Sequence, residues 1–198
     1  MTTEMRAMAP RLILTGFMAT GKSAVAAVVA RRLGWPLIDT DQRLVARAGK
    51  PIAAIFSEDG EPEFRRLERE VIEEIAGDPR RCALCGRPRP AVVATGGGAL
   101  VDEANYRALN ASGVIICLSA RPEVIARRVK KSRTERPKLL AGGKPLSDRI
   151  AELLAERREA YARAEATIDT SDITVEEAAE RVLAAFILRG EPRCARSA

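Results

Sequence analysis

Short apolar runs alternate with longer amphipathic stretches along most of the chain. Five apolar runs have the length and composition of buried β-strands: residues 11–15, 36–41, 91–95, 114–118 and 166–170. The stretches with helical periodicity of apolar positions are 23–33, 42–48, 52–56, 61–76, 102–110, 121–129, 147–164 and 174–188. Strands that alternate with helices in this way predict an α/β fold with a parallel sheet.

Three stretches interrupt this pattern. Residues 77–90 combine arginine, proline and cysteine and indicate an irregular insertion. Residues 130–145 are basic at first and then contain glycine and proline, which is typical of a mobile lid, although a solvated basic loop has the same composition. Residues 189–198 have the character of a frayed tail. Because no linker or internal repeat divides the chain, we expect one domain over 1–198 with its core at 11–188.

A glycine-rich stretch, Gly16-Phe17-Met18-Ala19-Thr20-Gly21-Lys22-Ser23, lies between the first predicted strand and the first predicted helix. It matches the phosphate-binding pattern G-x-x-x-x-G-K-[ST], in which backbone N–H groups and a helix N-terminus face the phosphates. Lys22 can reach the β- and γ-phosphates, and the Ser23 hydroxyl can bind Mg²⁺. The pattern predicts that a nucleoside triphosphate is bound by Ala19, Thr20, Gly21, Lys22, Ser23 and Ala24.

The second predicted strand ends in two carboxylates, Asp39 and Asp41. Residues i and i+2 share one face of a strand, so we expect both side chains at the carboxyl end of the sheet, where ligands bind in open α/β folds. Asp39 is then placed to hold Mg²⁺ through water, and Asp41 to face the acceptor substrate. The alternative is capping of the helix that begins at Gln42, which explains one aspartate but not two.

An Arg/Glu pair and a run of glycines are two further features of the sequence, and the glycines suggest a close approach to a ligand. Arg65 and Glu68 lie at i and i+3 of one predicted helix, so Glu68 can brace the guanidinium; on spacing alone a solvated ion pair would be favoured. Gly96, Gly97 and Gly98 follow the third predicted strand directly. Three consecutive glycines cost conformational entropy, which is reasonable where the backbone must approach a ligand or offer N–H groups to it.

The amino-acid composition limits which residue can act as a catalytic base and which classes of partner the protein can bind. The 198 residues include no histidine, so a catalytic base must be a carboxylate or a lysine. The net charge of +6 suits anionic ligands, whereas an aromatic content of 4% does not suit a surface that stacks nucleic-acid bases. No apolar run reaches the roughly 18 residues that span a membrane, and residues 1–10 lack the apolar core of a secretory signal. We therefore expect a cytoplasmic protein with no nucleic-acid or membrane partner.

The four cysteines are expected to be reduced thiols. Cys82 and Cys85 form a C-x-x-C pair in the irregular insertion, Cys117 lies in a predicted strand, and Cys194 lies in the tail. A structural zinc site normally needs four Cys or His ligands, and here the pair has no second pair and no histidine. Plain loop thiols are the favoured interpretation, and a metal or redox role is the alternative.

Taken together, these motifs resemble the shikimate kinase family, within the nucleoside-monophosphate-kinase-like branch of P-loop proteins. The resemblance covers roughly residues 11–187 and rests on six motifs in order: the phosphate loop 16–23, Asp39-Thr40-Asp41, Gly60-Glu61-x-x-Phe64-Arg65-x-x-Glu68, Gly96-Gly97-Gly98, Arg136-Pro137 and Arg157-x-x-x-Tyr161. It implies a three-layer P-loop kinase fold, with a five-stranded parallel sheet in the order 2-3-1-4-5 between helices. It also implies a substrate-binding segment at about 42–76 and a lid at about 130–145.

The resemblance implies transfer of the γ-phosphoryl of ATP, with Mg²⁺, to the 3-hydroxyl of shikimate in aromatic amino-acid biosynthesis. It places the substrate on Asp41, Arg65, Gly96, Gly97, Gly98 and Arg157. Arg65, Arg157 and the Gly97 N–H would bind the carboxylate, which suits the planar fork of arginine. Arg136 would reach the ATP phosphates from the lid, and Arg128 would stack on adenine. The implied catalytic residues are Lys22, Asp41 and Arg136, and the implied Mg²⁺ residues are Ser23 and, through water, Asp39.

The sequence departs from the family pattern in its lid and its insertion. The lid segment Arg136-Pro137-Lys138-Leu139-Leu140 is one residue longer than the usual Arg-Pro-Leu-Leu, and the C-x-x-C insertion lies outside the pattern. The residues leave open whether Asp41 is a general base or only orients the hydroxyl. Another small-molecule kinase, of the gluconate or nucleotide type, is the alternative; the paired arginines and the triple glycine argue against it. We expect a monomer.

Overall fold

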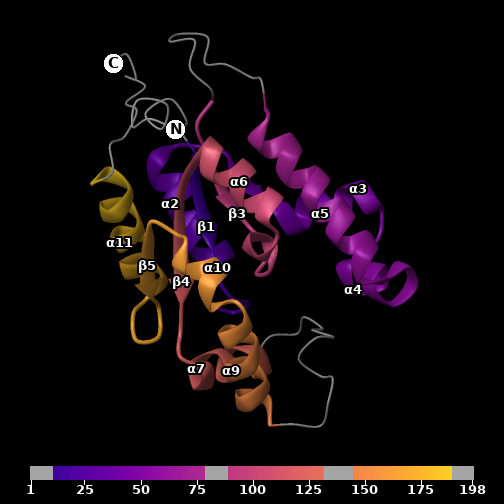
Figure 1. Ribbon diagram of the computed structural model, residues 1–198. Coiled ribbons are helices and arrows are strands. Elements are labelled where there is room, and N and C mark those ends of the chain that lie inside the picture. Colours follow the sequence, from indigo (N-terminus) through magenta and orange to yellow (C-terminus); the bar gives the residue numbers. More distant parts are fainter. Residues whose placement is uncertain (1–10, 79–88, 132–144, 189–198) are drawn as a thin grey trace.

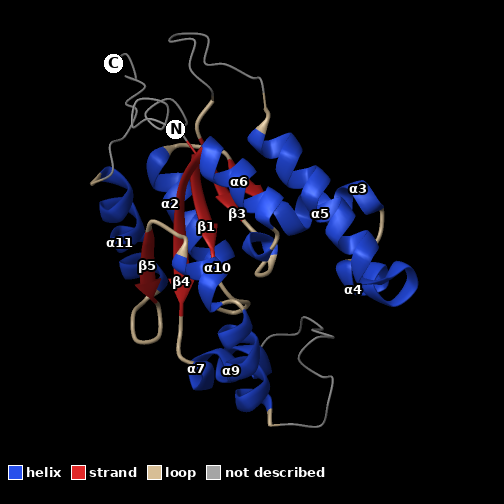
Figure 2. Ribbon diagram, in the orientation of Figure 1, coloured by secondary structure: helices blue, strands red, loops and turns tan. Residues whose placement is uncertain are grey.

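The computed structural model describes residues 11–78, 89–131 and 145–188. Its centre is a five-stranded sheet in the order β2-β3-β1-β4-β5. Every neighbouring pair of strands is parallel, so all carboxyl ends lie at one edge (Figure 2). The strands are β1 (Arg11–Thr15), β2 (Leu37–Asp39), β3 (Ala91–Ala94), β4 (Gly113–Ser119) and β5 (Ala166–Asp169). This architecture confirms the predicted α/β sheet and its strand order.

Helices cover both faces of the sheet (Figure 1). The main covering helices are α2 (Lys22–Leu33), α5 (Gly60–Ala76), α6 (Glu103–Ser112) and α11 (Val175–Ile187). Alternate side chains of β1 point to opposite faces: Leu12 and Leu14 pack with α2 and α11, and Ile13 packs with α5 and α6. All three side chains are fully buried, so β1 lies between two apolar layers. Burial on both faces explains why the inner strands β1, β3 and β4 are continuous apolar runs in the sequence. The edge strands β2 and β5 are partly exposed, so the prediction of a buried strand is wrong for these two.

The remaining elements lie beside the sheet and around its carboxyl edge. They are α3 (Thr40–Ala48), α4 (Ile52–Ala54), the π-helical turn η1 (Ile55–Asp59), the 3-10 turn η2 (Ala99–Val101), α7 (Pro122–Lys131), α9 (Leu146–Glu156) and α10 (Arg158–Ala162). Helices α7 and α9 lie below the carboxyl ends of the strands in Figure 1 and share a small apolar cluster with Phe17. The phosphate loop is therefore packed between the sheet and this helical pair.

The prediction that Asp39 and Asp41 emerge together from one strand is wrong. Strand β2 ends at Asp39, and α3 begins at Thr40. The Asp39 Oδ1 atom accepts hydrogen bonds from the Asp41 and Gln42 N–H groups at 3.0 and 3.2 Å, so Asp39 is the N-cap of α3. N-capping satisfies N–H groups that have no partner within the helix, which starts the helix earlier than its apolar pattern indicates. Asp41 consequently lies in the first helical turn.

Two predicted helices also differ. The helix predicted at 52–56 ends earlier, at Ala54 of α4, and a π-helical turn continues from Ile55 to Asp59. The helix predicted at 147–164 is divided into α9 and α10 by Arg157, whose φ and ψ are −104° and 3°. Arg157 is 8% exposed, so the break coincides with burial of a guanidinium.

Several sequence predictions lie outside the described residues. They concern Arg136 and most of the expected lid, Cys82 and Cys85 of the insertion, and the tail with Cys194. Cys117, in β4, is a free and buried thiol, as the sequence predicted. No helix in the described ranges is long and apolar enough to cross a lipid bilayer.

Candidate active site

The phosphate loop connects β1 to α2 in the conformation that its sequence predicts. Its backbone has positive φ angles at Gly16, Ala19 and Gly21, of 130°, 60° and 98°. A side chain at Gly16 would place its Cβ 2.0 Å from the Leu118 carbonyl oxygen, so this position requires glycine. The Lys22 Nζ donates to the Phe17 carbonyl oxygen at 2.9 Å, which holds the ammonium group across the loop.

Ser23 and Asp39 meet at the carboxyl edge of the sheet. The Ser23 Oγ donates to the Asp39 Oδ2 at 3.4 Å, while Oδ1 of the same carboxylate caps α3. The capping bonds fix the carboxylate, and its second oxygen is left facing the hydroxyl. Hard oxygen ligands next to a phosphate site are what Mg²⁺ prefers, so these two residues fit the ion that the sequence predicts.

Two acidic side chains flank the first glycine after β3. A Cβ placed on Gly96 would lie 2.8 Å from the Asp41 Oδ1 and 3.1 Å from the Glu68 Oε1, so both carboxylates face this glycine. Burial raises the pKa of Asp41, the negative charge of Asp39 raises it further, and Lys22 partly offsets both. Burial also raises the pKa of Glu68, and Arg65 partly offsets that effect.

The Gly96 N–H donates to the Thr40 Oγ at 2.9 Å. This backbone donor, which the sequence suggested for a ligand, is thus used within the protein. Gly96 instead leaves room for the two carboxylates, because any side chain would displace them. The space that the two carboxylates need is therefore a sufficient reason for glycine at position 96, and no hydrogen bond to a substrate is required to explain it.

Arg65 projects from α5 onto the same glycine loop. Its guanidinium lies 2.5 Å from the Glu68 carboxylate and 3.2 Å from that of Glu61. A Cβ on Gly98 would lie 3.1 Å from both terminal nitrogens of Arg65. The Glu68 side chain is 3% exposed and that of Glu61 is 49% exposed, so Glu68 braces the arginine and Glu61 is the partner that a ligand can replace.

Arg157 reaches the glycine loop from the break between α9 and α10. Its Nη1 donates to the Gly97 carbonyl oxygen at 3.0 Å, and its guanidinium lies 5.3 Å from the centre of the Phe17 ring. The Tyr161 hydroxyl donates to the same carbonyl at 2.5 Å, and burial raises the pKa of Tyr161 to about 12. Tyr161 thus supports Arg157 at the site. The sequence indicates only the spacing of these two residues and not this role of the tyrosine.

Gly97 joins the two halves of the site. A Cβ at this residue would lie 3.2 Å from the Met18 N and 3.3 Å from the Gly16 carbonyl oxygen, so its backbone packs directly on the phosphate loop. The carbonyl of the same residue binds Arg157. The predicted acceptor residues and the predicted nucleotide residues are therefore brought together around one short loop at the carboxyl edge of the sheet.

Arg128 contacts the phosphate loop from α7. Its Nη1 donates to the Ala19 carbonyl oxygen at 3.3 Å and to the Thr170 Oγ1 at 3.1 Å. Its Nη2 donates to the Thr170 carbonyl oxygen at 2.6 Å. The edge of the guanidinium is thus engaged by the backbone, and a guanidinium bound by its edge can still present its flat face to an adenine ring. Stacking on adenine stays a prediction.

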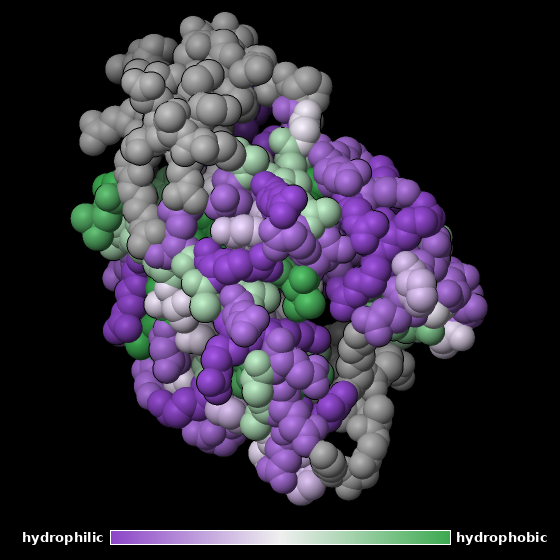
Figure 3. Space-filling view, in the orientation of Figure 1, coloured by the Kyte–Doolittle hydropathy of each residue, from purple (hydrophilic) through white to green (hydrophobic). Residues whose placement is uncertain are grey.

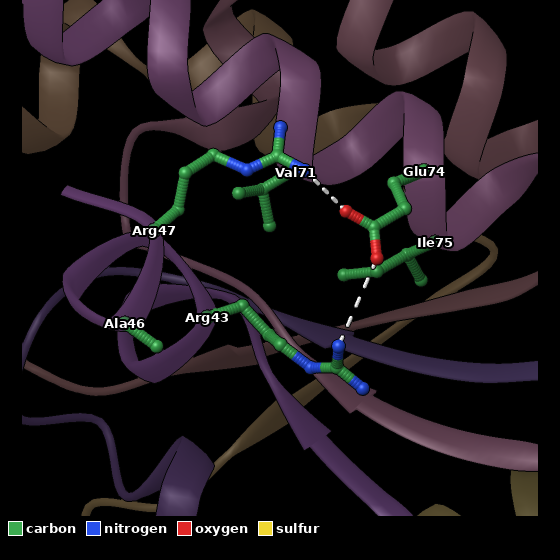
Figure 4. Close-up of a pocket in the computed structure, with 6 residues that line it drawn as sticks. All are labelled: Arg43, Ala46, Arg47, Val71, Glu74 and Ile75. Carbon is green, nitrogen blue, oxygen red and sulfur yellow. Dashed lines mark hydrogen bonds and ion pairs between the residues drawn. The ribbon is translucent and has the colours of Figure 1, made fainter.

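A dense set of ion pairs joins the helices that carry Asp41 and Arg65. Arg43 and Arg47 of α3 approach Glu74 of α5 from two sides, at 3.8 and 2.5 Å (Figure 4). They line a pocket, and the part of the surface around α3 to α5 that is visible in Figure 3 is mostly hydrophilic. Because the charges in this pocket are already paired with one another, we interpret it as a brace between α3 and α5.

Comparisons with known proteins agree with this site. The family model described as shikimate kinase matches residues 18–186. A shikimate kinase of Caldanaerobacter subterraneus is 44% identical over 176 residues, which cover 89% of this chain and 95% of the relative. Another, of Desulforudis audaxviator, is 47% identical over 159 residues, which cover 80% of this chain and 77% of the relative.

A solved structure extends the agreement to three dimensions. Shikimate kinase from Acinetobacter baumannii, in complex with shikimate, superposes with a TM-score of 0.78 at 26% identity, over 94% of this chain and 98% of that one. The match to the family model includes the phosphate loop from Met18 onward, the glycine loop and the Arg157 region. On its sequence, its sheet order and the arrangement of its site, this chain belongs to the shikimate kinase family.

Proposed function

We propose that this chain transfers the γ-phosphoryl group of ATP to the 3-hydroxyl of shikimate, giving shikimate 3-phosphate and ADP for aromatic amino-acid biosynthesis. The observation that carries the proposal is the position of Gly97, whose backbone packs on the phosphate loop and whose carbonyl binds Arg157. A carboxylate held near Gly97 would place its attached ring beside the phosphates of ATP. Membership of the family supports this choice of acceptor.

On the nucleotide side, the phosphates would be bound by the N–H groups of residues 19–24 and by Lys22. The amine of Lys22 would leave the Phe17 carbonyl oxygen, 2.9 Å away, and turn toward the β- and γ-phosphates. Ser23 and Asp39 would hold Mg²⁺, Asp39 through water, and the ion would neutralise phosphate charge. Arg128 would stack on adenine, and Arg136 would add a positive charge from the lid.

On the acceptor side, Arg65 and Arg157 would bind the carboxylate of shikimate together with the Gly97 N–H. Arg65 would exchange its exposed partner Glu61 for the substrate and keep Glu68. Both arginines lie against the glycine loop, Arg65 at Gly98 and Arg157 at Gly97, so they approach one region from α5 and from the break between α9 and α10. Planar guanidinium groups bind a carboxylate through paired hydrogen bonds, which gives orientation as well as charge.

Asp41 would bind the ring hydroxyls, including the one that reacts. The hydroxyl oxygen forms a bond to the γ-phosphorus, the bond between that phosphorus and the bridging oxygen breaks, and ADP leaves with the electron pair. The hydroxyl proton passes to Asp41 or, if Asp41 only orients the hydroxyl, to the product phosphate. Phosphoryl transfer depends mainly on positioning and on neutralisation of charge, so either route is adequate.

We also infer the organisation in which this site works. One kinase domain spans residues 1–198, with its core at 11–188, a substrate-binding segment at 42–76 and a lid at 130–145. The brace between α3 and α5 lets much of the substrate-binding segment move as one unit. The protein would act as a cytoplasmic monomer, with ATP and shikimate as its substrates and with no nucleic-acid or membrane partner.

The proposal is tested by offering shikimate, gluconate and a nucleoside monophosphate to the enzyme with ATP and Mg²⁺. We expect phosphorylation of shikimate, with the phosphate on the 3-hydroxyl as located by NMR. The site would bind a carboxylate at the two arginines and a ring hydroxyl at Asp41. Gluconate has a carboxylate but no rigid ring that extends from it to Asp41, and a nucleoside monophosphate has no carboxylate. Turnover of gluconate or of a nucleotide without turnover of shikimate would contradict the assignment.

The pH dependence of kcat/KM tests the role of Asp41. Its carboxylate form is the one that can bind or deprotonate a hydroxyl, so activity should fall as the pH is lowered through its pKa. Burial raises that pKa above the ordinary 3.8, so the fall should begin at a higher pH than for an exposed aspartate. The Asp41→Asn variant should have low activity without this acid limb. An identical limb in the variant would assign it to another group.

The stability of the same variant provides the control. A folded-state pKa above the unfolded value means that the folded protein binds more protons, so Asp41 lowers the free energy of unfolding once the pH exceeds the unfolded pKa. Replacing it by asparagine removes that cost. The melting temperature of Asp41→Asn at neutral pH should therefore equal or exceed that of the parent, which separates lost activity from lost folding.

A further inference from the structure

Two carbonyl groups of the phosphate loop are held by residues from distant parts of the chain. The Ala19 carbonyl oxygen accepts from the Arg128 Nη1 at 3.3 Å, and the Thr20 carbonyl oxygen accepts from the Thr170 Oγ1 at 2.9 Å. Ala19 is the one residue other than glycine with a positive φ, 60°, within the described ranges. Such a backbone conformation persists only where its surroundings impose it.

The Thr170 hydroxyl has one proton and two carbonyl oxygens within reach, those of Thr20 at 2.9 Å and Ser119 at 3.0 Å. The Ser119 carbonyl already accepts the Thr170 N–H at 2.9 Å. The Thr170 hydroxyl therefore donates to the Thr20 carbonyl oxygen, because each of the two carbonyl oxygens then accepts one hydrogen bond. The hydroxyl oxygen in turn accepts from the Arg128 Nη1 at 3.1 Å, so its donor and acceptor capacities are both used.

This bond network is buried and fixed. Thr170 is 4% exposed and Thr20 is fully buried, so water does not readily replace the bond between them. The segment after Thr170 is itself held to the start of α7: the Ser171 Oγ accepts the Arg121 N–H at 2.9 Å, and Asp172 pairs with the Arg121 guanidinium through two contacts of 2.7 Å. Thr170 thus belongs to a segment that is fixed by its own contacts, and the phosphate loop is hydrogen-bonded to this segment.

We propose that Thr170 is a positioning residue for ATP. By keeping the Thr20 carbonyl turned outward, its hydroxyl keeps the neighbouring N–H groups of the phosphate loop turned toward the nucleotide. A carbonyl that rotated inward would present a negative dipole to the phosphates and remove donors from them. This inference rests on the ATP site of the proposed function and adds a residue from the end of β5, which no part of the phosphate-loop pattern contains.

The test compares Thr170→Val, which keeps the shape and removes the hydroxyl, with Thr170→Ser, which keeps the hydroxyl. Loss of a buried hydrogen bond that leaves a carbonyl unpaired predicts an increase of about tenfold in the Kd of ADP for Thr170→Val. The KM for ATP should rise in parallel, whereas the Kd of shikimate measured without nucleotide should stay at the parental value. Thr170→Ser should bind ADP nearly as the parent does.

Thr167→Val is the matched control, because Thr167 is an exposed residue of β5, whereas Thr170 is buried. It should leave the Kd of ADP unchanged. Melting temperatures of all variants identify any that is unfolded, and Thr170→Ala then replaces Thr170→Val in the comparison with serine. Parental ADP affinity in a folded Thr170→Val or Thr170→Ala variant would overturn the inference.

The inference and the proposed function fail in different ways. If the parent binds ADP but does not phosphorylate shikimate, the proposed acceptor is wrong, and the effect of Thr170 on ADP binding is still measurable. If the parent phosphorylates shikimate and the Thr170 variants lose shikimate affinity but not ADP affinity, the proposed function stands and the positioning role is contradicted.

Discussion

Replacement of Lys22 by alanine is expected to lower kcat by about 10²- to 10³-fold, the usual cost of removing one donor to the charge of a transition state. The ammonium group crosses the phosphate loop to the Phe17 carbonyl oxygen, at 2.9 Å, so it is within the loop that would hold the β- and γ-phosphates. Its charge would act most strongly as negative charge shifts toward the leaving oxygen. The loss should therefore be larger in kcat than in the Kd of ADP.

The control for this experiment is Lys50→Ala. Lys50 lies just beyond the end of α3 and forms partly exposed ion pairs with Glu58 and Asp59, at 2.8 and 2.5 Å, so it carries the same charge without contact to the phosphate loop. Exposed ion pairs contribute little to stability, and we expect a kcat within about twofold of the parent. A near-parental kcat in Lys22→Ala would show that Lys22 does not act on the transferred phosphoryl group.

The second large effect is expected for the two arginines at the glycine loop. Arg65→Lys and Arg157→Lys keep the charge and lose the paired geometry of the guanidinium. Each should weaken shikimate binding by about 10- to 100-fold, the range for a lost charged hydrogen bond, and should leave the affinity for an ATP analogue almost unchanged. The double variant should lose less binding free energy than the sum of the single variants, because both arginines act on one carboxylate.

Binding constants of the four proteins for shikimate and for the ATP analogue provide the measurement. Arg69→Lys is the matched control, since Arg69 lies on the same helix as Arg65 and pairs with Asp102 at the surface, at 2.8 Å. It should bind both ligands as the parent does. Strictly additive losses would argue against a shared carboxylate, and losses in nucleotide affinity alone would move the affected arginine to the ATP side.

The sheet and the phosphate loop could be predicted from local patterns because both depend on short-range features. Apolar runs without alternation indicate strands covered on both faces, and Leu12, Ile13 and Leu14 confirm that interpretation. Glycines at Gly16 and Gly21 have the positive φ angles that their pattern requires. In such stretches the local preference and the tertiary structure agree.

The errors occur where a contact distant in sequence overrides a local pattern. Helical periodicity continues through residues 147–164, yet the chain breaks at Arg157 because its side chain is buried against Gly97 and Phe17. Periodicity reports which residues face the core and carries no information about a partner 60 residues away. The capping of α3 by Asp39 is a local exception, because the carboxylate accepts from N–H groups two and three residues later, and this cap prevails over the extended pattern that continues to Asp41.

The same reason explains which site residues were missed. Asp41, Arg65, Gly97 and Arg157 belong to motifs, and the structure brings all four to one loop region. Thr170 belongs to no recognised motif, and its role depends on its contact with Thr20, 150 residues earlier. A small polar residue directly after an apolar strand, at the edge where ligands bind, is the only signal in the sequence.

The central claim is that ATP turnover at this site depends on shikimate. The most direct measurement is the rate of ADP release, coupled to an optical signal, at saturating ATP and Mg²⁺ with and without shikimate. We predict a rate that rises with shikimate concentration to saturation, with one ADP released for each shikimate 3-phosphate formed. ADP release that is the same with and without shikimate, or that rises only with a different acceptor, would contradict the account.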